Sequence, residues 1–248
     1  MDKREVQALV DSIAHWYHRI SLTHGIVTPG VNDTQGCLAL LDLPTNLSGM
    51  RVLDIGARDG FYSFECERRG ADVVAIDYMS PEQTGFPVAR KILNARVDLT
   101  QENLYRLRPE TWGTFDLVLC LGVLYHLRDP LWALDILRSL TRRRLILETH
   151  VIDEAVLLPD GTKRALEEVA PQLSHVPLLQ FYPRNSLNND YTNYWGANMC
   201  GVAAILAEAN FRVTRQVING ERGIFDCTVA DDTEMSYFCN IARLPVRT

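Results

Sequence analysis

Residues 52–64 read VLDIGARDGFYSF and combine an apolar strand, a tight turn and the start of a helix. In an α/β sheet, a turn of this kind holds a nucleotide. Its two glycines, Gly56 and Gly60, are four residues apart, so the G-x-G-x-x-G spacing of dinucleotide sites is absent. The chain also lacks the G-x-x-x-x-G-K-[ST] loop that holds triphosphates. The turn therefore predicts a nucleoside ligand without phosphate.

Acidic side chains recur at the ends of the neighbouring strands. Asp54 lies in the first strand and is expected to face an ammonium group, whereas Asp77 ends the next strand, where a carboxylate accepts hydrogen bonds from ribose hydroxyls. Asp98 and Leu99 follow in the motif VDL, and we expect the carboxylate and the backbone N–H to contact adenine. The pattern predicts an acidic pocket for a positively charged adenosine derivative.

Short apolar runs alternate with helical stretches from residue 51 onward, which is typical of an α/β protein with a doubly wound, mostly parallel sheet. We expect seven strands in all, the last two within FRVTRQVI (211–218) and SYFCNIARL (236–244). The other strands are expected at 51–55, 72–76, 96–98, 115–121 and 144–149, with helices beginning near 60, 87, 101 and 129.

The sequence divides into two expected domains. Residues 1–45 form a helical lid segment, because the apolar side chains of residues 4–20 recur at steps of three and four. Residues 46–248 form the ligand-binding domain, with an insertion at about 153–194 that is rich in Pro, Asn and Asp. A stretch this long without regular structure is typical of a functional lid, and its aromatic residues favour that interpretation.

Composition excludes several other classes of protein. The net charge of −6 argues against a broad basic face that binds nucleic acid. The six cysteines form no C-x-x-C pair, which is typical of a reducing compartment. No apolar run is long enough to span a bilayer, and the N-terminus lacks the apolar core of a signal peptide. We therefore expect a cytoplasmic protein that does not enter membranes.

Four motifs, VLDIGARDG, AIDY, VDL and FDLVLCLGVLYHL, occur in an order that resembles class I S-adenosylmethionine-dependent methyltransferases. Arg58 stands where the commonest form of the first motif has a glycine. The resemblance implies a Rossmann-like fold, methyltransferase activity and S-adenosylmethionine as the cofactor. The cofactor-binding residues that it implies are Tyr17, Asp54, Gly56, Ala57, Arg58, Gly60, Asp77, Tyr78, Asp98, Leu99, Leu121 and Tyr125.

A narrower resemblance rests on WYHRISLTHGIVTPG, GVLYHLRDP and LETHVID, which are similar to a subgroup containing the tRNA wobble-uridine carboxymethyltransferase and many bacterial small-molecule methyltransferases. The tRNA enzymes have a lysine just before a Gly-Pro-Phe turn, but here Thr23 and His24 precede Gly25. Without that cation a carboxylated cofactor is held less well, so plain S-adenosylmethionine and a small-molecule acceptor are favoured. Carboxymethyl transfer to tRNA, a noncatalytic adenosine-binding module and a homodimer all stay open.

His126 is the candidate catalytic residue, because it follows the fourth strand at the edge where ligands bind, and its ordinary pKa suits a general base. The competing interpretation is a histidine that only hydrogen-bonds the backbone. His15 and His18 could share one helical face, but no third metal ligand is evident, so no metal is expected. The expected substrate-binding residues are Trp16, His18, Glu148, Phe181, Tyr182, Trp195 and Asn198.

Overall fold

A computed structural model of the chain describes residues 1–230. Its central sheet has seven strands in the order β10-β11-β5-β4-β1-β2-β3, which confirms the predicted fold class. The chain forms two compact units, Met1–Leu119 and a second that begins at Cys120, and each is described by itself. The strands of the sheet are β1 (Arg51–Ile55), β2 (Asp72–Asp77), β3 (Leu99–Gln101), β4 (Phe115–Leu121), β5 (Thr141–His150), β10 (Phe211–Asn219) and β11 (Arg222–Val229).

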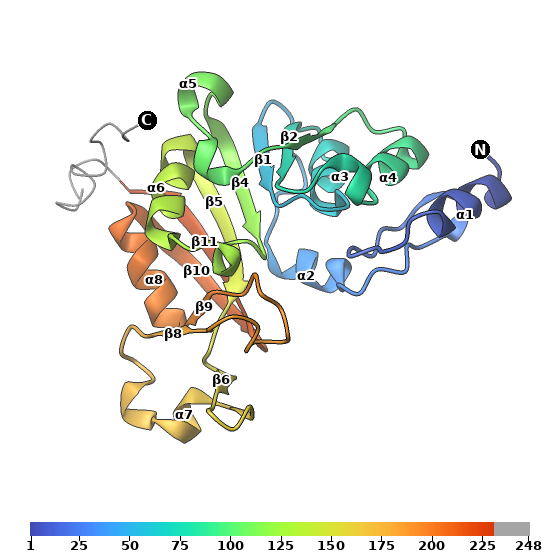
Figure 1. The fold of residues 1–248 in the computed structure, drawn as a ribbon. Helices are drawn as coiled ribbons and strands as arrows, with labels where there is room; N and C mark the ends of the chain where they lie inside the picture. Colours follow the sequence, from blue (N-terminus) through green and yellow to red (C-terminus); the bar gives the residue numbers. More distant parts are fainter. Residues whose placement is uncertain (231–248) are drawn as a thin grey trace. The chain divides into compact units, whose positions relative to one another are not determined.

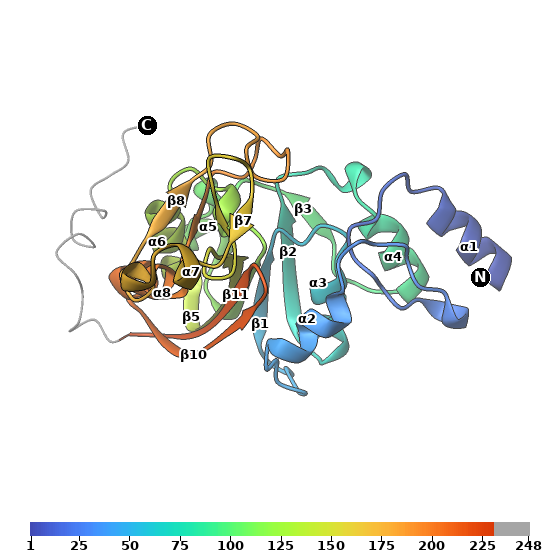
Figure 2. The same cartoon turned by 90° about the horizontal axis from the view of Figure 1, so that it is seen from below.

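The first unit is built around three parallel strands, β1, β2 and β3, which lie side by side in Figure 2. Residues 52–55 of β1 are all buried, as expected for a parallel strand that is covered on both faces. The helices of this unit are α1 (Lys3–Asp11), η1 (Thr23–Gly25), α2 (Thr34–Leu40), α3 (Phe61–Arg68), η2 (Pro81–Gln83), α4 (Phe86–Leu93), η3 (Leu104–Arg106) and α5 (Pro109–Trp112).

The predicted helix over residues 4–20 is wrong beyond residue 11. Helix α1 ends at Asp11, and the following residues are held by tertiary contacts instead of helical hydrogen bonds. The indole of Trp16 is buried and donates to the carbonyl of Val10. The N–H groups of Tyr17 and His18 donate to a carboxylate 42 and 41 residues away, respectively. These backbone donors are therefore satisfied outside a helix, which removes the reason for one to continue.

The strand expected at 96–98 lies three residues later, at β3 (Leu99–Gln101). Its register pairs Leu99 with Ala75 and Gln101 with Asp77. The helix expected near residue 101 is only the single turn η3. The short β3 follows immediately on Asp98, so the motif VDL marks the beginning of this strand and not its end.

The second unit contains the antiparallel strands of the sheet. Strand β11 pairs with β5 on one side and with β10 on the other, and α8 packs along β10 (Figure 1). Strand β11 was not predicted, and the strand expected at 236–244 lies outside the described residues. The remaining elements of this unit are η4 (Leu124–His126), α6 (Pro130–Leu140), β6 (Val156–Leu157), β7 (Lys163–Arg164), α7 (Leu166–Val169), η5 (Pro171–Leu173), β8 (Leu179–Phe181), β9 (Trp195–Ala197) and α8 (Met199–Glu208).

The insertion at 153–194 is more regular than its composition indicates. It holds the hairpin of β6 and β7, the short helix α7 and strand β8, which pairs with β9. A small apolar cluster of Ile152, Tyr182 and Leu187 anchors it. The expectation of a stretch without regular structure is therefore wrong.

Gly60 shows how tightly the turn after β1 is packed. Its φ is +90°, and a Cβ there would lie 2.6 Å from ring carbons of both Phe64 and Phe86. Gly49 also has a positive φ, +77°, but among the described residues no neighbouring atom lies within 4 Å of the place that a Cβ would take there. A substitution at Gly49 therefore tests backbone strain alone, whereas one at Gly60 tests backbone strain together with steric overlap.

We predict that Gly60→Ala lowers the free energy of unfolding by about 2–5 kcal/mol, since left-handed strain of about 1–2 kcal/mol adds to overpacking of about 1–3 kcal/mol. Gly49→Ala should cost only the strain. Urea denaturation of both variants measures the difference. Equal losses in the two variants would show that the Phe64 and Phe86 rings yield without cost.

Candidate functional site

The turn after β1 is a tight loop that contains three left-handed residues. Gly56, Arg58 and Gly60 all have positive φ, at +74°, +52° and +90°. The N–H groups of Gly56 and Ala57 donate to the carbonyl of Ile76 at 2.9 and 3.0 Å, which fixes the turn against β2. Arg58 thus keeps the left-handed conformation of the glycine in the commoner motif, at a cost of about 1–2 kcal/mol.

Asp77 lies where the sequence predicts a ribose-binding carboxylate. It ends β2, is 4% exposed, and accepts the N–H groups of Arg58 at 3.0 Å and of Met79 at 2.9 Å. A carboxylate offers about four acceptor positions, so two remain for a pair of hydroxyls. Burial raises the pKa of Asp77, although these backbone hydrogen bonds oppose the rise.

Asp54 is buried within β1 and accepts a hydrogen bond of 2.5 Å from the hydroxyl of Ser63 on α3. Burial raises the pKa of Asp54 to about 6, and the negative charge of Asp77 adds to the rise. Two buried carboxylates that repel each other favour a ligand that carries positive charge. The buried carboxylates beside the turn therefore favour a cationic nucleoside over a ligand that carries a phosphate.

Asp59 organises this turn and was not predicted from the sequence. It is completely buried, and its Oδ2 accepts the N–H groups of Tyr17 at 2.7 Å and His18 at 2.9 Å. Its Oδ1 accepts the N–H of Gly85 at 2.8 Å. One carboxylate therefore ties the N-terminal segment and the start of α4 to the turn. The one sequence feature that could have indicated this role is the position of Asp59 between Gly56 and Gly60.

Two expected substrate-binding residues have packing roles in the first unit. Trp16 is 3% exposed and packs against Gly85, where a methyl group would lie 2.1 Å from the indole. His18 is 4% exposed, contacts the ring of Tyr62 and accepts the N–H of Phe61 at Nδ1. Burial lowers the pKa of His18 to about 4, so its ring is neutral. The expectation that these side chains face a substrate is corrected accordingly. Tyr17 contributes its backbone N–H, and its ring lies 6.0 Å from the Arg58 guanidinium.

Asp98 and Leu99 are not brought together with Asp77. In the parallel register, Gln101 is the partner of Asp77, and the N–H of Glu102 donates to the Asp77 carbonyl. Asp98 precedes the strand and pairs with Arg90 at 3.0 Å. This register disfavours the expected adenine contact of Asp98 and places Gln101 beside Asp77 instead. Tyr78, which is 72% exposed, has its carbonyl bonded to the Gln101 amide.

The other predicted residues lie in the second unit, at and after the end of β4. Leu121 ends β4, and Tyr125 lies in the single turn η4, 7% exposed, with the Arg222 guanidinium 4.9 Å from its ring. Arg222 also pairs with Glu148 of β5 at 3.4 Å. Burial raises the pKa of Glu148, and Arg222 opposes the rise. Glu148 is therefore a partly buried acid, 17% exposed at its side chain, with a cation beside it.

His126, the predicted base, ends η4 and is half-buried. Its Nδ1 lies 3.0 Å from the carbonyl oxygen of Thr192 and 2.9 Å from the hydroxyl of the same residue. Burial lowers the pKa of His126, while Thr192 and Asp190 raise it in part. The ring is therefore neutral at neutral pH, as a general base must be.

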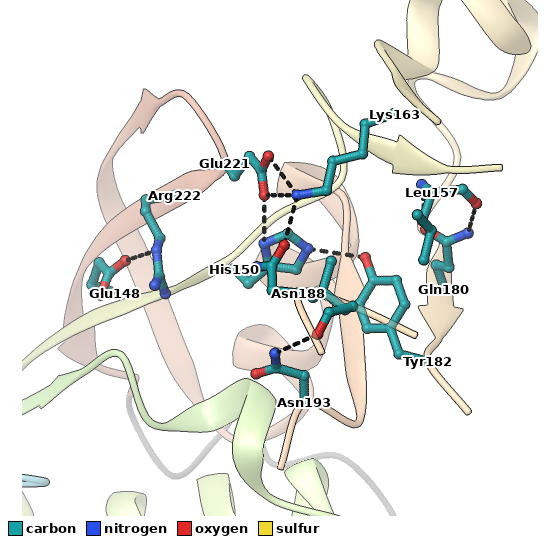
Figure 3. A network of polar contacts seen from close by, with 11 residues as sticks. Glu148, His150, Leu157, Lys163, Gln180, Tyr182, Asn188, Asn193, Glu221 and Arg222 are labelled. Carbon is teal, nitrogen blue, oxygen red and sulfur yellow. Dashed lines mark hydrogen bonds and ion pairs between the residues drawn. The ribbon is translucent and has the colours of Figure 1, made fainter. Parts of the chain in front are cut away.

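A second histidine, His150, anchors the insertion to the sheet (Figure 3). Its Nε2 lies 2.9 Å from the hydroxyl of Tyr182, and its Nδ1 lies 3.8 Å from Glu221. Lys163 pairs with the same glutamate at 2.8 Å. Burial lowers the pKa of His150 to about 4, so this ring is also neutral. The network was not predicted, because its members come from segments that are far apart along the chain.

The four expected substrate residues of the late segment differ in role. Phe181 is 63% exposed, whereas Tyr182 is buried on His150. Trp195 is buried and donates from its indole to the carbonyl of Leu127 at 2.8 Å. Asn198 caps α8, and both ends of its amide are bound to backbone groups between residues 174 and 201. The expectation for Asn198 is corrected, since its amide is fully used within the fold.

Residues 1–230 contain neither a metal-binding cluster nor a membrane-spanning helix. Among these residues no three His, Cys, Asp or Glu side chains form a group that could hold a metal ion. Within the same range no helix is long and apolar enough to cross a bilayer.

A methyltransferase domain family matches residues 34–194, which is more than half of the chain. The chain therefore belongs to this methyltransferase family and is an enzyme of that class. The match includes the turn after β1, Asp77 and His126.

Relatives are found by sequence and by structure. The tRNA U34 carboxymethyltransferase of Actinobacillus succinogenes is 36% identical over 121 residues, which are 46% of this chain and 37% of that enzyme. The enzyme of the same name from Pseudomonas aeruginosa strain LESB58 is 35% identical over 133 residues, 50% of this chain and 40% of the relative. The chain thus spans well under half the length of these curated relatives.

Solved structures resemble a larger part of the chain. The N-terminal domain of EvdMO1, crystallised in the presence of SAH and D-fucose, has a TM-score of 0.61 and 19% identity, and the match covers 93% of this chain and 97% of that domain. Magnesium protoporphyrin IX methyltransferase (ChlM) of Synechocystis PCC 6803, with bound SAH, has a TM-score of 0.55 and 21% identity, covering 79% of this chain and 81% of the other. At these identities the likeness supports the fold.

We predict that Asp54→Asn stabilises the ligand-free protein at pH 7–8. The pKa of Asp54 in the folded state, about 6, lies above the ordinary value of 3.8. The folded state therefore binds the proton more tightly, and stability is lost as pH rises through 6. Asparagine removes this loss, by up to about 3 kcal/mol, and can still accept the Ser63 hydroxyl.

Urea denaturation at pH 4, 6 and 8 measures the effect. The advantage of Asp54→Asn over the wild type should be small at pH 4 and greatest at pH 8. Asp72→Asn, at a carboxylate 77% exposed, controls for the change in net charge. A constant difference across the three pH values would contradict the raised pKa of Asp54.

Proposed function

We propose that the protein transfers a methyl group from S-adenosylmethionine to a small-molecule acceptor. The observation that carries the proposal is the turn after β1, which joins a left-handed backbone to two buried carboxylates. This combination suits an adenosine that carries a sulfonium and an ammonium group, and it does not suit a dinucleotide. Membership of the methyltransferase family supports the same donor.

Residues of the first unit would hold this donor. Asp77 would accept the ribose hydroxyls, Asp54 would face the ammonium group, and Gly56 would let the ligand approach the backbone. Tyr78 and Gln101, next to Asp77, would contact adenine. Bound there, the donor would supply a methyl group on positively charged sulfur, open to in-line attack by a nucleophile.

Residues of the second unit would act on the acceptor. His126 would take a proton from the attacking group through Nε2, because Nδ1 faces the Thr192 carbonyl. Asn193 is 5% exposed, and within residues 1–230 its buried amide oxygen has no hydrogen-bond partner, so a donor group of the acceptor would supply the hydrogen bond that this oxygen lacks. Glu148, partly buried next to Arg222, would accept a further hydroxyl or N–H.

A small acceptor is favoured over tRNA for three reasons. The net charge is −6, which disfavours a polyanion. Thr23 and His24 occupy the position of the lysine expected for a carboxylated cofactor. A domain that matches 93% of the chain in fold was crystallised in the presence of SAH and a small molecule, D-fucose. Cytoplasmic location stays a prediction, supported by free thiols at the five described cysteines.

We predict that Asp77→Asn weakens binding of S-adenosylmethionine about 5- to 150-fold, by about 1–3 kcal/mol, because charged hydrogen bonds to ribose are lost. Asp98→Asn, at a carboxylate 71% exposed at the start of β3, should bind within about twofold of the wild type. Isothermal titration calorimetry with S-adenosylmethionine measures both constants. If the two variants bind alike, Asp77 is not the ribose ligand.

A second experiment identifies the class of acceptor. Purified protein is incubated with S-adenosylmethionine that carries a deuterated methyl group, together with either a cell extract of small molecules or total tRNA. We expect the label in a compound of low molecular mass and none in digested tRNA nucleosides. Labelled tRNA, or turnover only with the carboxylated cofactor, would replace this proposal with that of the tRNA enzyme.

A further inference from the structure

The segment Asp190–Trp195, at the end of the insertion, is hydrogen-bonded to η4 and to the residue after it through three of its residues. The Thr192 carbonyl and hydroxyl lie at 3.0 and 2.9 Å from Nδ1 of His126. The N–H of Tyr194 donates to the carbonyl of Tyr125 at 3.0 Å. The Trp195 indole donates to the carbonyl of Leu127. The candidate base therefore lies in a turn that this segment fixes.

The hydrogen bonds around Thr192 determine which nitrogen of His126 carries the proton. A carbonyl oxygen only accepts, so Nδ1 must donate to it. The Thr192 hydroxyl donates to Oδ1 of Asp190 at 2.7 Å, which leaves its lone pairs for the same Nδ1–H. Asp190 is fixed in turn, because it also accepts the Thr192 N–H at 2.8 Å. A neutral ring with its proton on Nδ1 has its lone pair on Nε2.

We propose that Thr192 and Asp190 are positioning residues that hold His126 in the Nδ1–H tautomer and thereby make Nε2 the proton acceptor of the reaction. The inference rests on the proposed function for the reaction, but the tautomer itself is a property of the protein alone. When the acceptor loses its proton to Nε2, the ring becomes a cation. The carboxylate of Asp190, reached through the Thr192 hydroxyl, then stabilises that charge.

The groups that face His126 act in opposite directions. Asp190 favours the protonated ring, whereas Arg222 and burial disfavour it. The ring of Tyr125 lies 4.0 Å from that of His126. Asp190→Asn therefore removes the carboxylate and leaves the influence of Arg222, so the pKa of His126 should fall.

The chain contains a matched control for this arrangement. Asp160 and Thr162 form the same turn as Asp190 and Thr192, with the Thr162 N–H at 2.9 Å and its hydroxyl at 2.7 Å from Oδ1 of Asp160. Among the described residues, only the turn of Asp190 and Thr192 is hydrogen-bonded to a histidine, His126. Asp160→Asn and Thr162→Val therefore reproduce the loss of the turn without touching His126.

Nuclear magnetic resonance of ¹⁵N-histidine-labelled full-length protein tests the tautomer directly. The wild type should show His126 with its proton on Nδ1. Thr192→Val keeps the carbonyl but loses the hydroxyl that links the ring to Asp190, so it should lower the pKa of His126 by about half a unit or more with the proton still on Nδ1. Asp190→Asn should lower the pKa in the same way, and Thr192→Ser should restore the wild-type spectrum. The Asp160 and Thr162 variants should leave the His126 signals unchanged.

The same variants should also change the kinetics of methyl transfer. Thr192→Val should lower kcat about tenfold with an unchanged Kd for S-adenosylmethionine, and Asp190→Asn should move the acidic limb of the kcat/KM profile to lower pH. An Nε2–H tautomer in the wild type, or a His126 spectrum and pKa that neither variant changes, would overturn the positioning role. If the tautomer behaves as expected but no methyl group is transferred, the proposed function fails and the positioning role stands.

Discussion

The first unit depends on a single buried charge, the carboxylate of Asp59. It accepts three backbone N–H groups, from Tyr17, His18 and Gly85, and none of its surface is exposed. Charge-assisted hydrogen bonds of this kind are each worth about 1.5–3 kcal/mol, and a buried carboxylate without them would cost far more. The N-terminal segment, the turn and the start of α4 are therefore held together at one point. The left-handed residues on either side of Asp59 gain their rigidity from this junction.

The sequence predicts correctly those strands that are specified by residues close together along the chain. Strands β1 and β4 were expected at the residues where they lie, because continuous apolar runs bounded by turns specify buried strands. The helix over 4–20 failed because its periodicity competes with tertiary hydrogen bonds, and periodicity does not reveal them. The three-residue error at β3 misplaced Asp98, since in a parallel pair the register decides which side chain lies beside Asp77.

The candidate site was predictable to a similar extent. His126 could be proposed from its position after β4, but Thr192 could not, because it is 66 residues away and its motif, Asp-x-Thr, is also present at Asp160 without a histidine. The contacts of His150 with Tyr182, Glu221 and Lys163 were not predicted for the same reason. Sequence motifs identify the groups that perform chemistry, whereas the groups that orient them come from whatever segment the fold brings near.

The neutral state of His126 and His150 bears on the choice of acceptor. His126 and His150 both have pKa values lowered by burial, so neither presents a positive charge at neutral pH. Arg222 is engaged by Glu148, and Lys163 is engaged by Glu221. Each of these cations thus has a carboxylate beside it, and a phosphate-bearing acceptor would have to compete with that carboxylate. Under the proposed function, an uncharged acceptor with an ionisable O–H or N–H would gain more, because Nε2 of His126 would take its proton, and Glu148 and Asn193 would accept its hydrogen bonds without loss of an ion pair.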